Sequence, residues 1–183
     1  MTGTFVAVVG ASGTGKDTII GIARDRLADD ARFRFVRRAV TRPADTQAED
    51  HAPMDEQAFG EAARRGDFAL WWRAHELSYG IPAIADDDIA RGRVVVANLS
   101  RTILPAMAAR YPRHLVVEVT VPAGLRAKRL AARGRENGEA VALRLNRAVE
   151  FERTASIVSI DNSGPPELAG ELFSTVLTGL VEG

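Results

Sequence analysis

The chain has 183 residues, of which 24 are lysine or arginine and 24 are aspartate or glutamate, so its formal net charge is zero. This balance gives no global basic field for nucleic acid or a membrane surface, and the absence of cysteine excludes disulfides and thiolate metal sites. Because no stretch is apolar for long enough to span a bilayer and no signal-peptide pattern begins the chain, we expect one cytoplasmic domain over residues 1–183.

Strand-like and helix-like patterns alternate along the sequence. In chain order they predict strand Thr4–Gly10, helix Lys16–Ala28, strand Phe33–Val40, a helix from Asp55 to Arg65, strands Phe68–Ala74 and Leu77–Ile81, helix Pro82–Ala90, strand Arg93–Leu99, helix Thr102–Arg110, strand His114–Val121, helices Pro122–Ala132 and Glu139–Arg153, strand Ser156–Ile160 and helix Pro166–Leu180. This alternation argues for an α/β fold with a central parallel sheet covered by helices. The polar stretch from about 37 to 81 has strands of its own, and we interpret it as a small substrate-binding subdomain over the ligand cleft.

The segment GASGTGKDT, residues 10–18, is the most informative feature of the sequence. It follows an apolar strand and precedes a helix, which is the context in which the phosphate-binding loop GxxxxGK[ST] has physical meaning. Glycines let several backbone N–H groups converge on one anion. Lys16 adds a mobile positive charge, and the positive end of the helix points at the same place. The expected nucleotide-binding residues are Gly10, Ala11, Ser12, Gly13, Thr14, Gly15, Lys16, Asp17 and Thr18.

Asp17 departs from this motif, which has Ser or Thr at that position to bind magnesium through a hydroxyl. A carboxylate beside a triphosphate would repel it unless a cation lay between them. Either Asp17 is a Mg²⁺ ligand, directly or through water, or the loop does not hold a nucleotide. We favour the first and assign Asp17 to a metal site.

Arginines are concentrated in the segment 126–153, which has eight basic and four acidic residues in a chain with no net charge. Two lie in a glycine-bracketed loop, and two are three residues apart on one face of a predicted helix. A helix, a basic loop and a second helix in this order are typical of a lid that closes over phosphates, here at about 133–147. The candidate phosphate ligands of this lid are Arg133, Arg135, Arg144 and Arg147. The other basic residues of the segment read as solvated surface: Arg126, Lys128, Arg129 and Arg153.

Polar and aromatic residues also gather between 37 and 81. Arg38 and Arg42 lie at the end of the second predicted strand and in the loop after it, where a guanidinium could grip phosphate. The segment WWRAHELSYGIP holds both tryptophans of the chain, together with His75 and Tyr79. A core hairpin explains the aromatic residues but not the polar cluster. We therefore expect His75 and Tyr79 to lie in a substrate pocket. For the two tryptophans, the sequence favours neither the pocket nor the core.

Taken together, these motifs resemble the guanylate-kinase-like branch of the P-loop kinases. The matching motifs are GASGTGKDT, the TRP at Thr41–Pro43, the H-x-x-x-Y-G at His75–Gly80, the lid segment ARGREN and the arginines of ALRLNRA. The resemblance covers nearly the whole chain in order. It implies a P-loop NTPase fold of three layers, α/β/α, around a five-stranded parallel core, with a lid and a small substrate-binding subdomain, and transfer of the γ-phosphate of ATP.

The sequence departs from guanylate kinases in a consistent way. Those enzymes have Ser where Asp17 stands, a tyrosine that reads GMP in the loop after TRP, and an acidic residue where this chain has Asn98. In these departures the chain resembles the ribose 1,5-bisphosphate phosphokinases of phosphonate breakdown. That family has GKD in the loop, a strand end V-N-x-S-R, matched here by residues 97–101 (ANLSR), and GREN in the lid. We hypothesise that the carboxylate missing at position 98 is restored at position 17.

The resemblance implies that ATP phosphorylates ribose 1,5-bisphosphate to give 5-phosphoribosyl 1-diphosphate, with Mg²⁺ as the metal. Lys16 would hold the β- and γ-phosphates. The lid arginines Arg133, Arg135 and Arg144 would close on the migrating group, with Arg147 assisting. The residues expected around the acceptor are Arg38, Arg42 and Tyr79 at its phosphates and His75 and Asn98 near the sugar.

Two other functions stay open at this point. One is a guanylate kinase or another nucleoside monophosphate kinase. The other is a non-catalytic guanylate-kinase-like interaction module, although such modules typically lose the P-loop features that this chain keeps. We expect small-molecule substrates and neither nucleic acid nor membrane as partners, and the sequence leaves the oligomeric state open, a homodimer included.

Overall fold

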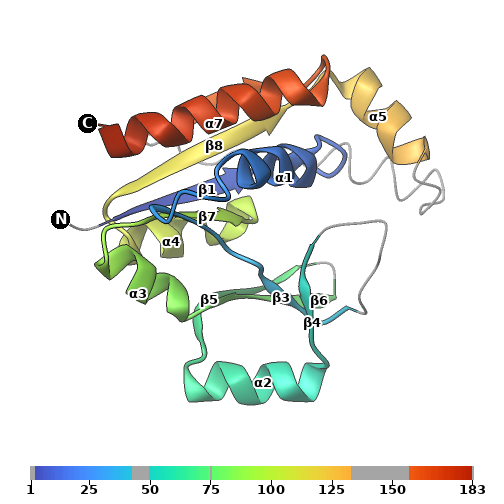
Figure 1. The fold of residues 1–183 in the computed structure, drawn as a ribbon. Helices are drawn as coiled ribbons and strands as arrows, with labels where there is room; N and C mark the ends of the chain where they lie inside the picture. Colours follow the sequence, from blue (N-terminus) through green and yellow to red (C-terminus); the bar gives the residue numbers. More distant parts are fainter. Residues whose placement is uncertain (1–2, 43–49, 75, 133–156, 183) are drawn as a thin grey trace.

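The computed structural model of the protein describes residues 3–42, 50–74, 76–132 and 157–182. Its centre is a five-stranded sheet in the order β2-β7-β1-β8-β9, in which every neighbouring pair is parallel (Figure 1). The strands are β1 (Thr4–Val9), β2 (Phe33–Phe35), β7 (Val94–Asn98), β8 (His114–Thr120) and β9 (Ile157–Asp161). Because the strands are parallel, their carboxyl ends meet at one edge of the sheet, and the segment that follows β1 lies between those that follow β7 and β8.

The two faces of this sheet are covered differently. Helices α1 (Lys16–Arg26) and α7 (Pro166–Glu182) pack on one face, where Ile19 and Phe173 are fully buried against the valines of β1 and β8. The other face packs on α4 (Leu104–Arg110) and on the second sheet, through Met107 and Trp72 among others. Alternation along each strand therefore decides whether a side chain faces α1 or the second sheet.

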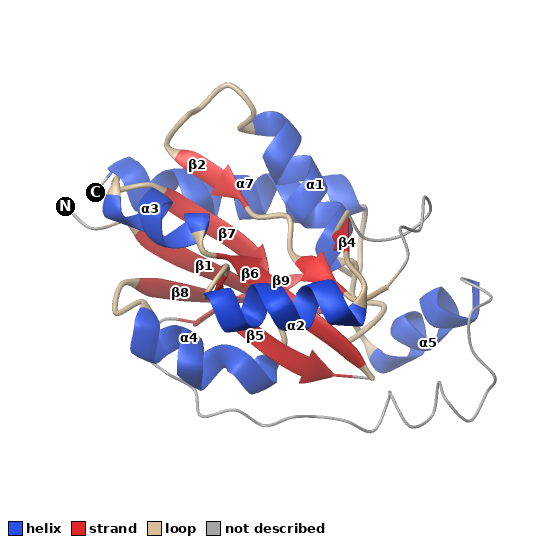
Figure 2. Cartoon of the chain, turned by 90° about the horizontal axis from the view of Figure 1, so that it is seen from below, coloured by secondary structure: helices blue, strands red, loops and turns tan. Residues whose placement is uncertain are grey.

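A smaller sheet lies beside this second face, in the order β4-β3-β6-β5. Its strands are β3 (Ala39–Val40), β4 (Ala52–Pro53), β5 (Phe68–Ala74) and β6 (Leu77–Pro82). Helix α2 (Glu56–Arg65) covers its outer side (Figure 2), and α3 (Ile84–Ala90) leads from β6 back to β7. Asp55 caps α2 by accepting a hydrogen bond from the amide of Ala58 at 2.7 Å, as its position before the helix predicts.

One predicted strand is wrong: Phe33–Val40 is not continuous. Its first part, β2, pairs with β7 and ends where the amide of Val36 bonds to the carbonyl of Val96. The chain then leaves the central sheet, and Ala39 and Val40 pair with β6 in the second sheet. Both parts contain buried apolar residues, so the sequence did not show that they belong to different sheets.

Strand β4 lies in a stretch for which the sequence predicted a loop. The other described elements agree with the prediction within a few residues at their ends. They include α5 (Ala123–Ala132), which follows β8, and the short 3-10 helix η1 (Arg101–Ile103) between β7 and α4. The lid at 133–147 and the helix Glu139–Arg153 lie outside the described residues.

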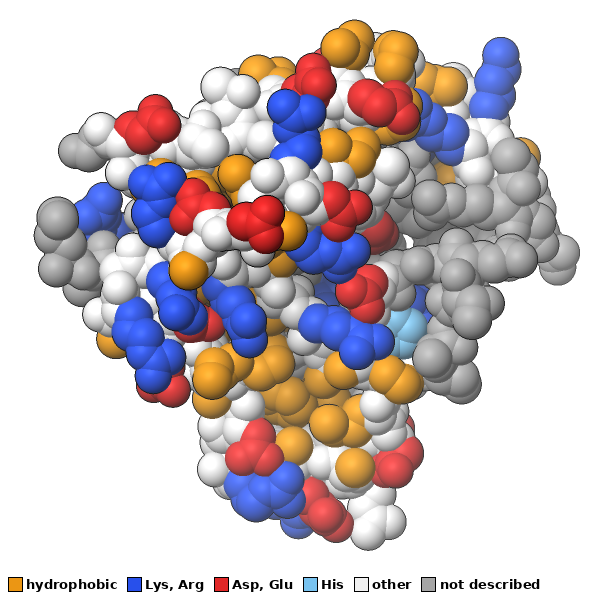
Figure 3. All heavy atoms as spheres, in the orientation of Figure 1, with side chains coloured by type: hydrophobic (Ala, Val, Ile, Leu, Met, Phe, Trp, Pro, Cys, Tyr) orange, Lys and Arg blue, Asp and Glu red, His pale blue; other side chains and the backbone are white. Residues whose placement is uncertain are grey.

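The surface agrees with the balanced composition. Over the face in Figure 3, Lys and Arg side chains are interspersed with Asp and Glu, so this face has no large area of a single sign. In the part of the chain that the structure describes, the longest apolar helices fall short of what is needed to cross a bilayer.

Candidate active site

The phosphate-binding loop lies between the end of β1 and the start of α1. Gly13 and Gly15 have φ angles of 86° and 85°, which L side chains rarely adopt. Gly15 is also the residue before α1, and its carbonyl accepts the first bond of the helix from the amide of Ile19. The loop therefore turns sharply into the positive end of a helix, as an anion-binding site requires.

Lys16 folds back over this loop. Its Nζ donates to the carbonyl oxygen of Gly10 at 2.8 Å and lies 3.4 Å from that of Ala11. The ammonium group is therefore held at the loop, although Lys16 belongs to the first turn of α1. A cation at this place adds to the field of the backbone amides toward a polyphosphate.

Asp17 and Asn98 are in contact. The Asn98 amide nitrogen, at the end of β7, donates to Oδ1 of Asp17 at 2.7 Å. The side chain of Arg38 reaches the same strand end, where its Nη1 donates to the carbonyl oxygen of Asn98 at 3.1 Å. Three residues that the sequence analysis selected from separate motifs thus meet at the carboxyl edge of the central sheet.

Tyr79 joins this group from the second sheet. The Arg38 guanidinium carbon lies 5.0 Å from the centre of the Tyr79 ring, a cation–π distance. Behind that ring, Trp72 stacks on it with ring centres 5.3 Å apart and planes 10° from parallel. Trp72 is buried and belongs to the core, whereas Trp71 is 51% exposed and points to the other side of β5.

Arg42 is fixed through its backbone. The Nε2 of His51, which is buried, lies 3.2 Å from the Arg42 carbonyl oxygen. The preceding residue, Thr41, bonds to β6 twice: its amide donates to the carbonyl of Ser78, and its Oγ1 accepts from the Ser78 amide. Thr41 and Arg42 are therefore attached to the same strand that carries Tyr79.

Comparison with known proteins decides the family. No protein-family model matches the chain. The ribose 1,5-bisphosphate phosphokinase PhnN of Brucella melitensis is 50% identical over 163 residues, which cover 88% of this chain and 85% of that protein. PhnN of Pseudofrankia inefficax is 52% identical over 175 residues, covering 96% and 90%. The chain belongs to the ribose 1,5-bisphosphate phosphokinase family.

The fold of this family member has a known relative among crystal structures. A guanylate kinase from Anaplasma phagocytophilum matches with a TM-score of 0.70, covering 97% of this chain and 86% of that one at 13% identity. At this identity the likeness shows the fold alone. Together the comparisons confirm the predicted family, the kinase activity and the guanylate-kinase-like α/β fold.

The sequence analysis missed the support behind the phosphokinase's loop. Asn162, directly after β9, is 2% exposed, and its Nδ2 donates to the carbonyl oxygen of Thr14 at 2.8 Å. Arg129 of α5 donates to the Asn162 carbonyl at 2.9 Å. The interpretation of Arg129 as solvated surface is therefore wrong. Nothing in the local sequence indicated that Asn162 contacts Thr14, 148 residues away, or that Arg129 contacts Asn162.

Five predicted site residues lie outside the described residues: His75, Arg133, Arg135, Arg144 and Arg147. The predicted loop, Asp17, Asn98, Arg38, Arg42 and Tyr79 are all described and occupy the carboxyl edge of the central sheet and the adjoining strands of the second sheet.

The donor set at Asp17 suits a magnesium ion bound mainly by substrate. Among the described residues, no group of three or more His, Cys, Asp or Glu side chains could enclose a metal. Mg²⁺ commonly takes one or two protein carboxylates and completes its shell with water and phosphate oxygens. Asp17 is exposed, and Asn98 engages one of its two carboxylate oxygens.

We predict that Asn162→Ala weakens nucleotide binding. Without the amide, the Thr14 carbonyl loses a buried donor and the loop loses its attachment to β9. The Michaelis constant for ATP should rise about tenfold, as expected for one lost buried hydrogen bond. Steady-state kinetics would measure it, with Ser163→Ala as the control at an exposed neighbouring position. An unchanged constant for ATP in folded Asn162→Ala would contradict this role.

Proposed function

We propose that the protein transfers the γ-phosphoryl group of ATP to ribose 1,5-bisphosphate, forming ADP and 5-phosphoribosyl 1-diphosphate in phosphonate breakdown. The observation that carries this proposal is the contact between Asp17 and Asn98. Both residues depart from the guanylate kinase pattern, and they touch at the edge of the sheet where the phosphate-binding loop begins. Family membership agrees with this acceptor.

This reaction mainly requires that the protein position the two substrates and neutralise the charge of their phosphates. The acceptor is itself a phosphate, whose oxygens are nucleophilic near neutral pH, so no strong general base is required. The two substrates together carry several negative charges, and bringing them into line is the main barrier that the protein must lower. The loop amides and Lys16 would hold the donor's β- and γ-phosphates.

The acceptor would lie between this loop and the second sheet. Arg38 is held there by the Asn98 carbonyl and by the face of Tyr79, and Arg42 lies on the adjoining segment. Guanidinium groups bind phosphate through paired hydrogen bonds. We therefore propose Arg38, Arg42 and Tyr79 as acceptor residues, and the lid arginines as the groups that close on the migrating phosphoryl.

Mg²⁺, when bound with ATP, would neutralise charge on the phosphates. Asp17 would supply the protein's carboxylate, and the Asn98 amide would orient it by occupying Oδ1. The carboxylate then lies on α1 rather than at the end of β7, but it reaches the same place. One anionic ligand is kept, and the total charge of the site is unchanged.

Guanylate kinase activity is the second candidate, and its support is the shared fold alone. The loop after TRP reads ADTQAEDHAPM and lacks the tyrosine by which guanylate kinases read GMP. We further propose that both substrates are small molecules met in the cytoplasm. The oligomeric state stays open.

The first test compares acceptors. In a coupled assay of ADP release, ribose 1,5-bisphosphate should give a kcat/KM at least about 100-fold above that of GMP, because a site that lacks base-reading groups gains nothing from a nucleobase. The product should be identified as 5-phosphoribosyl 1-diphosphate by mass. Preference for GMP would overturn the proposed acceptor.

The second test concerns the carboxylate. Asp17→Ser should raise the Mg²⁺ concentration for half-maximal activity about tenfold or more, because the site loses its anionic ligand. The double variant Asp17→Ser/Asn98→Asp places a carboxylate at the other position and should recover most of this loss. Asp25→Ser, on an exposed position of the same helix, is the control. If Asp17→Ser leaves the Mg²⁺ titration unchanged, or the double variant recovers nothing, the two positions do not share this role.

A further inference from the structure

An ion pair at the carboxyl edge of the central sheet is not used by the mechanism above. Nη2 of Arg101 donates to Oε1 of Glu118 at 2.7 Å. Both side chains are only 18% exposed. Burying two charges costs free energy that their attraction barely offsets. A pair of this kind at an active-site edge calls for a reason other than stability.

The pair crosses the strand that carries the phosphate-binding loop. Arg101 follows the end of β7, and Glu118 lies near the end of β8. Strand β1 runs between β7 and β8, so these two strands are about 10 Å apart. Glu118 is in register with Val9, the last residue of β1 before the loop. The side chains therefore meet across the end of β1, next to Gly10.

The pair lies on the face that the second sheet covers. Val117 and Val119 of β8 face α1 and α7, so alternation turns Glu118 to the opposite side, with Val116 and Val9. On that side the core includes Trp72, which stacks on Tyr79. Arg101 thus lies on the side of β1 away from Asp17, toward the strands that carry the proposed acceptor residues.

The guanidinium keeps unused hydrogen-bonding capacity. Of its donors, the structure assigns one to Glu118, and the buried Nε has no acceptor among the described residues. An arginine held by one carboxylate, with further N–H groups to offer, is suited to bind a phosphate. The ion pair also limits the net charge, so that the site is not strongly cationic before substrate binds.

We propose that Arg101 binds the reacting phosphate of the acceptor and that Glu118 positions it. This inference rests on the proposed function, which makes that group the 1-phosphate of ribose 1,5-bisphosphate. Arg38 and Arg42 would then be left to hold the remote 5-phosphate. A bisphosphate acceptor needs cationic groups at two separate places, and Arg101 supplies the one beside the loop.

The transfer step balances with these residues. An oxygen of the 1-phosphate forms the new bond to the γ-phosphorus of ATP, and the bond from that phosphorus to the β–γ bridging oxygen breaks. The bridging oxygen leaves with the electron pair as part of ADP. Arg101 takes no proton and gives none; it brings the nucleophilic oxygen into line and offsets repulsion between the two phosphates.

The test distinguishes an effect on the use of the acceptor from an effect on the binding of ATP, the phosphoryl donor. Arg101→Met should lower kcat/KM for ribose 1,5-bisphosphate by about 100-fold or more, while the dissociation constant of ATP, measured by calorimetry, changes less than about threefold. Arg101→Lys keeps the positive charge but lacks the planar guanidinium, so its kcat/KM for the acceptor should lie between those of the wild type and of Arg101→Met. Glu118→Gln should raise the KM for the acceptor about tenfold and leave the KM for ATP unchanged.

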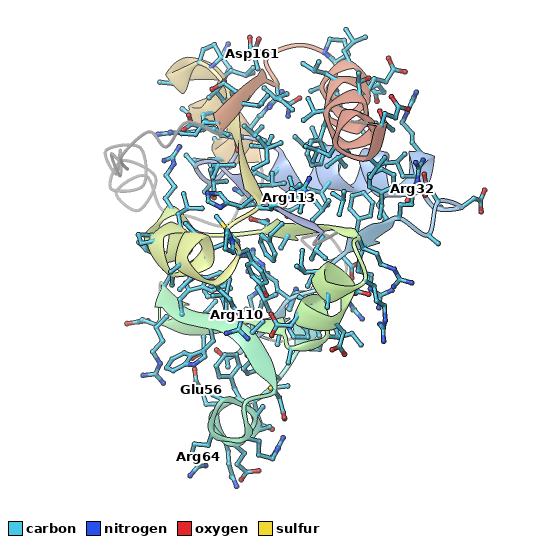
Figure 4. The ribbon with its side chains drawn as sticks, turned by 90° about the vertical axis from the view of Figure 1, so that its left-hand side faces the viewer. Arg32, Glu56, Arg64, Arg110, Arg113 and Asp161 are labelled. Carbon is cyan, nitrogen blue, oxygen red and sulfur yellow. The ribbon has the colours of Figure 1, made fainter. Side chains whose placement is uncertain are left out.

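Two further variants guard against loss of folding. Arg101→Met leaves the Glu118 carboxylate without its partner, so the double variant Arg101→Met/Glu118→Gln removes both charges and should melt near the wild-type temperature without regaining acceptor turnover. Arg110→Met is the matched control. Arg110 pairs with Asp86 at the opposite end of the sheet, between the layers in Figure 4, and its removal should leave the kinetics unchanged.

The outcomes are distinct. If folded Arg101→Met keeps acceptor turnover, or if it weakens ATP and acceptor equally, the pair is a structural bridge and the inference is wrong. If the wild-type protein phosphorylates GMP instead of ribose 1,5-bisphosphate, the proposed function fails. The same variants measured with GMP would then still decide whether Arg101 holds the acceptor's phosphate.

Discussion

The position of β1 between β7 and β8 is the constraint on which the site depends. Because all three strands are parallel, the phosphate-binding loop, Asn98 and Glu118 reach one edge of the sheet from three neighbouring strand ends. Helix α1 then brings Asp17 to Asn98 on one face. On the other face, the ion pair Arg101–Glu118 spans the end of β1. In the proposed mechanism, the nucleotide-binding loop with Asp17 and the acceptor residue Arg101 therefore lie on opposite sides of β1.

The two faces of the central sheet carry different sets of proposed site residues. On the α1 side, Lys16, Asp17 and the loop are the proposed site for a nucleotide with its metal, and Asn162 donates a hydrogen bond to the loop at Thr14. On the side of the second sheet, arginines predominate, oriented by a carbonyl, an aromatic ring or a carboxylate rather than by solvent. Orienting charged groups before substrate arrives lowers the reorganisation needed during transfer. The proposed transfer would rely on this arrangement rather than on a dedicated general base.

Much of the central sheet could be predicted from the sequence, because buried parallel strands leave continuous apolar runs and the loop motif fixes where β1 ends. The split of 33–40 into β2 and β3 could not, since both parts are apolar and only their partners differ. The same limit applies to the site. Asp17 and Asn98 were paired from their departures from a family pattern, whereas Asn162, Arg129 and the pair Arg101–Glu118 depend on contacts between distant segments that no local pattern records.

The most direct test of the central claim is calorimetric titration of the folded protein with Mg·ATP in the absence of acceptor. Wild-type protein should release or absorb heat with one binding site per chain. Lys16→Ala, with an unchanged melting temperature, should bind at least about tenfold more weakly, because the loop loses its one mobile cation. Absence of binding to wild-type protein, or equal binding by Lys16→Ala, would contradict the assignment of this loop to the nucleotide.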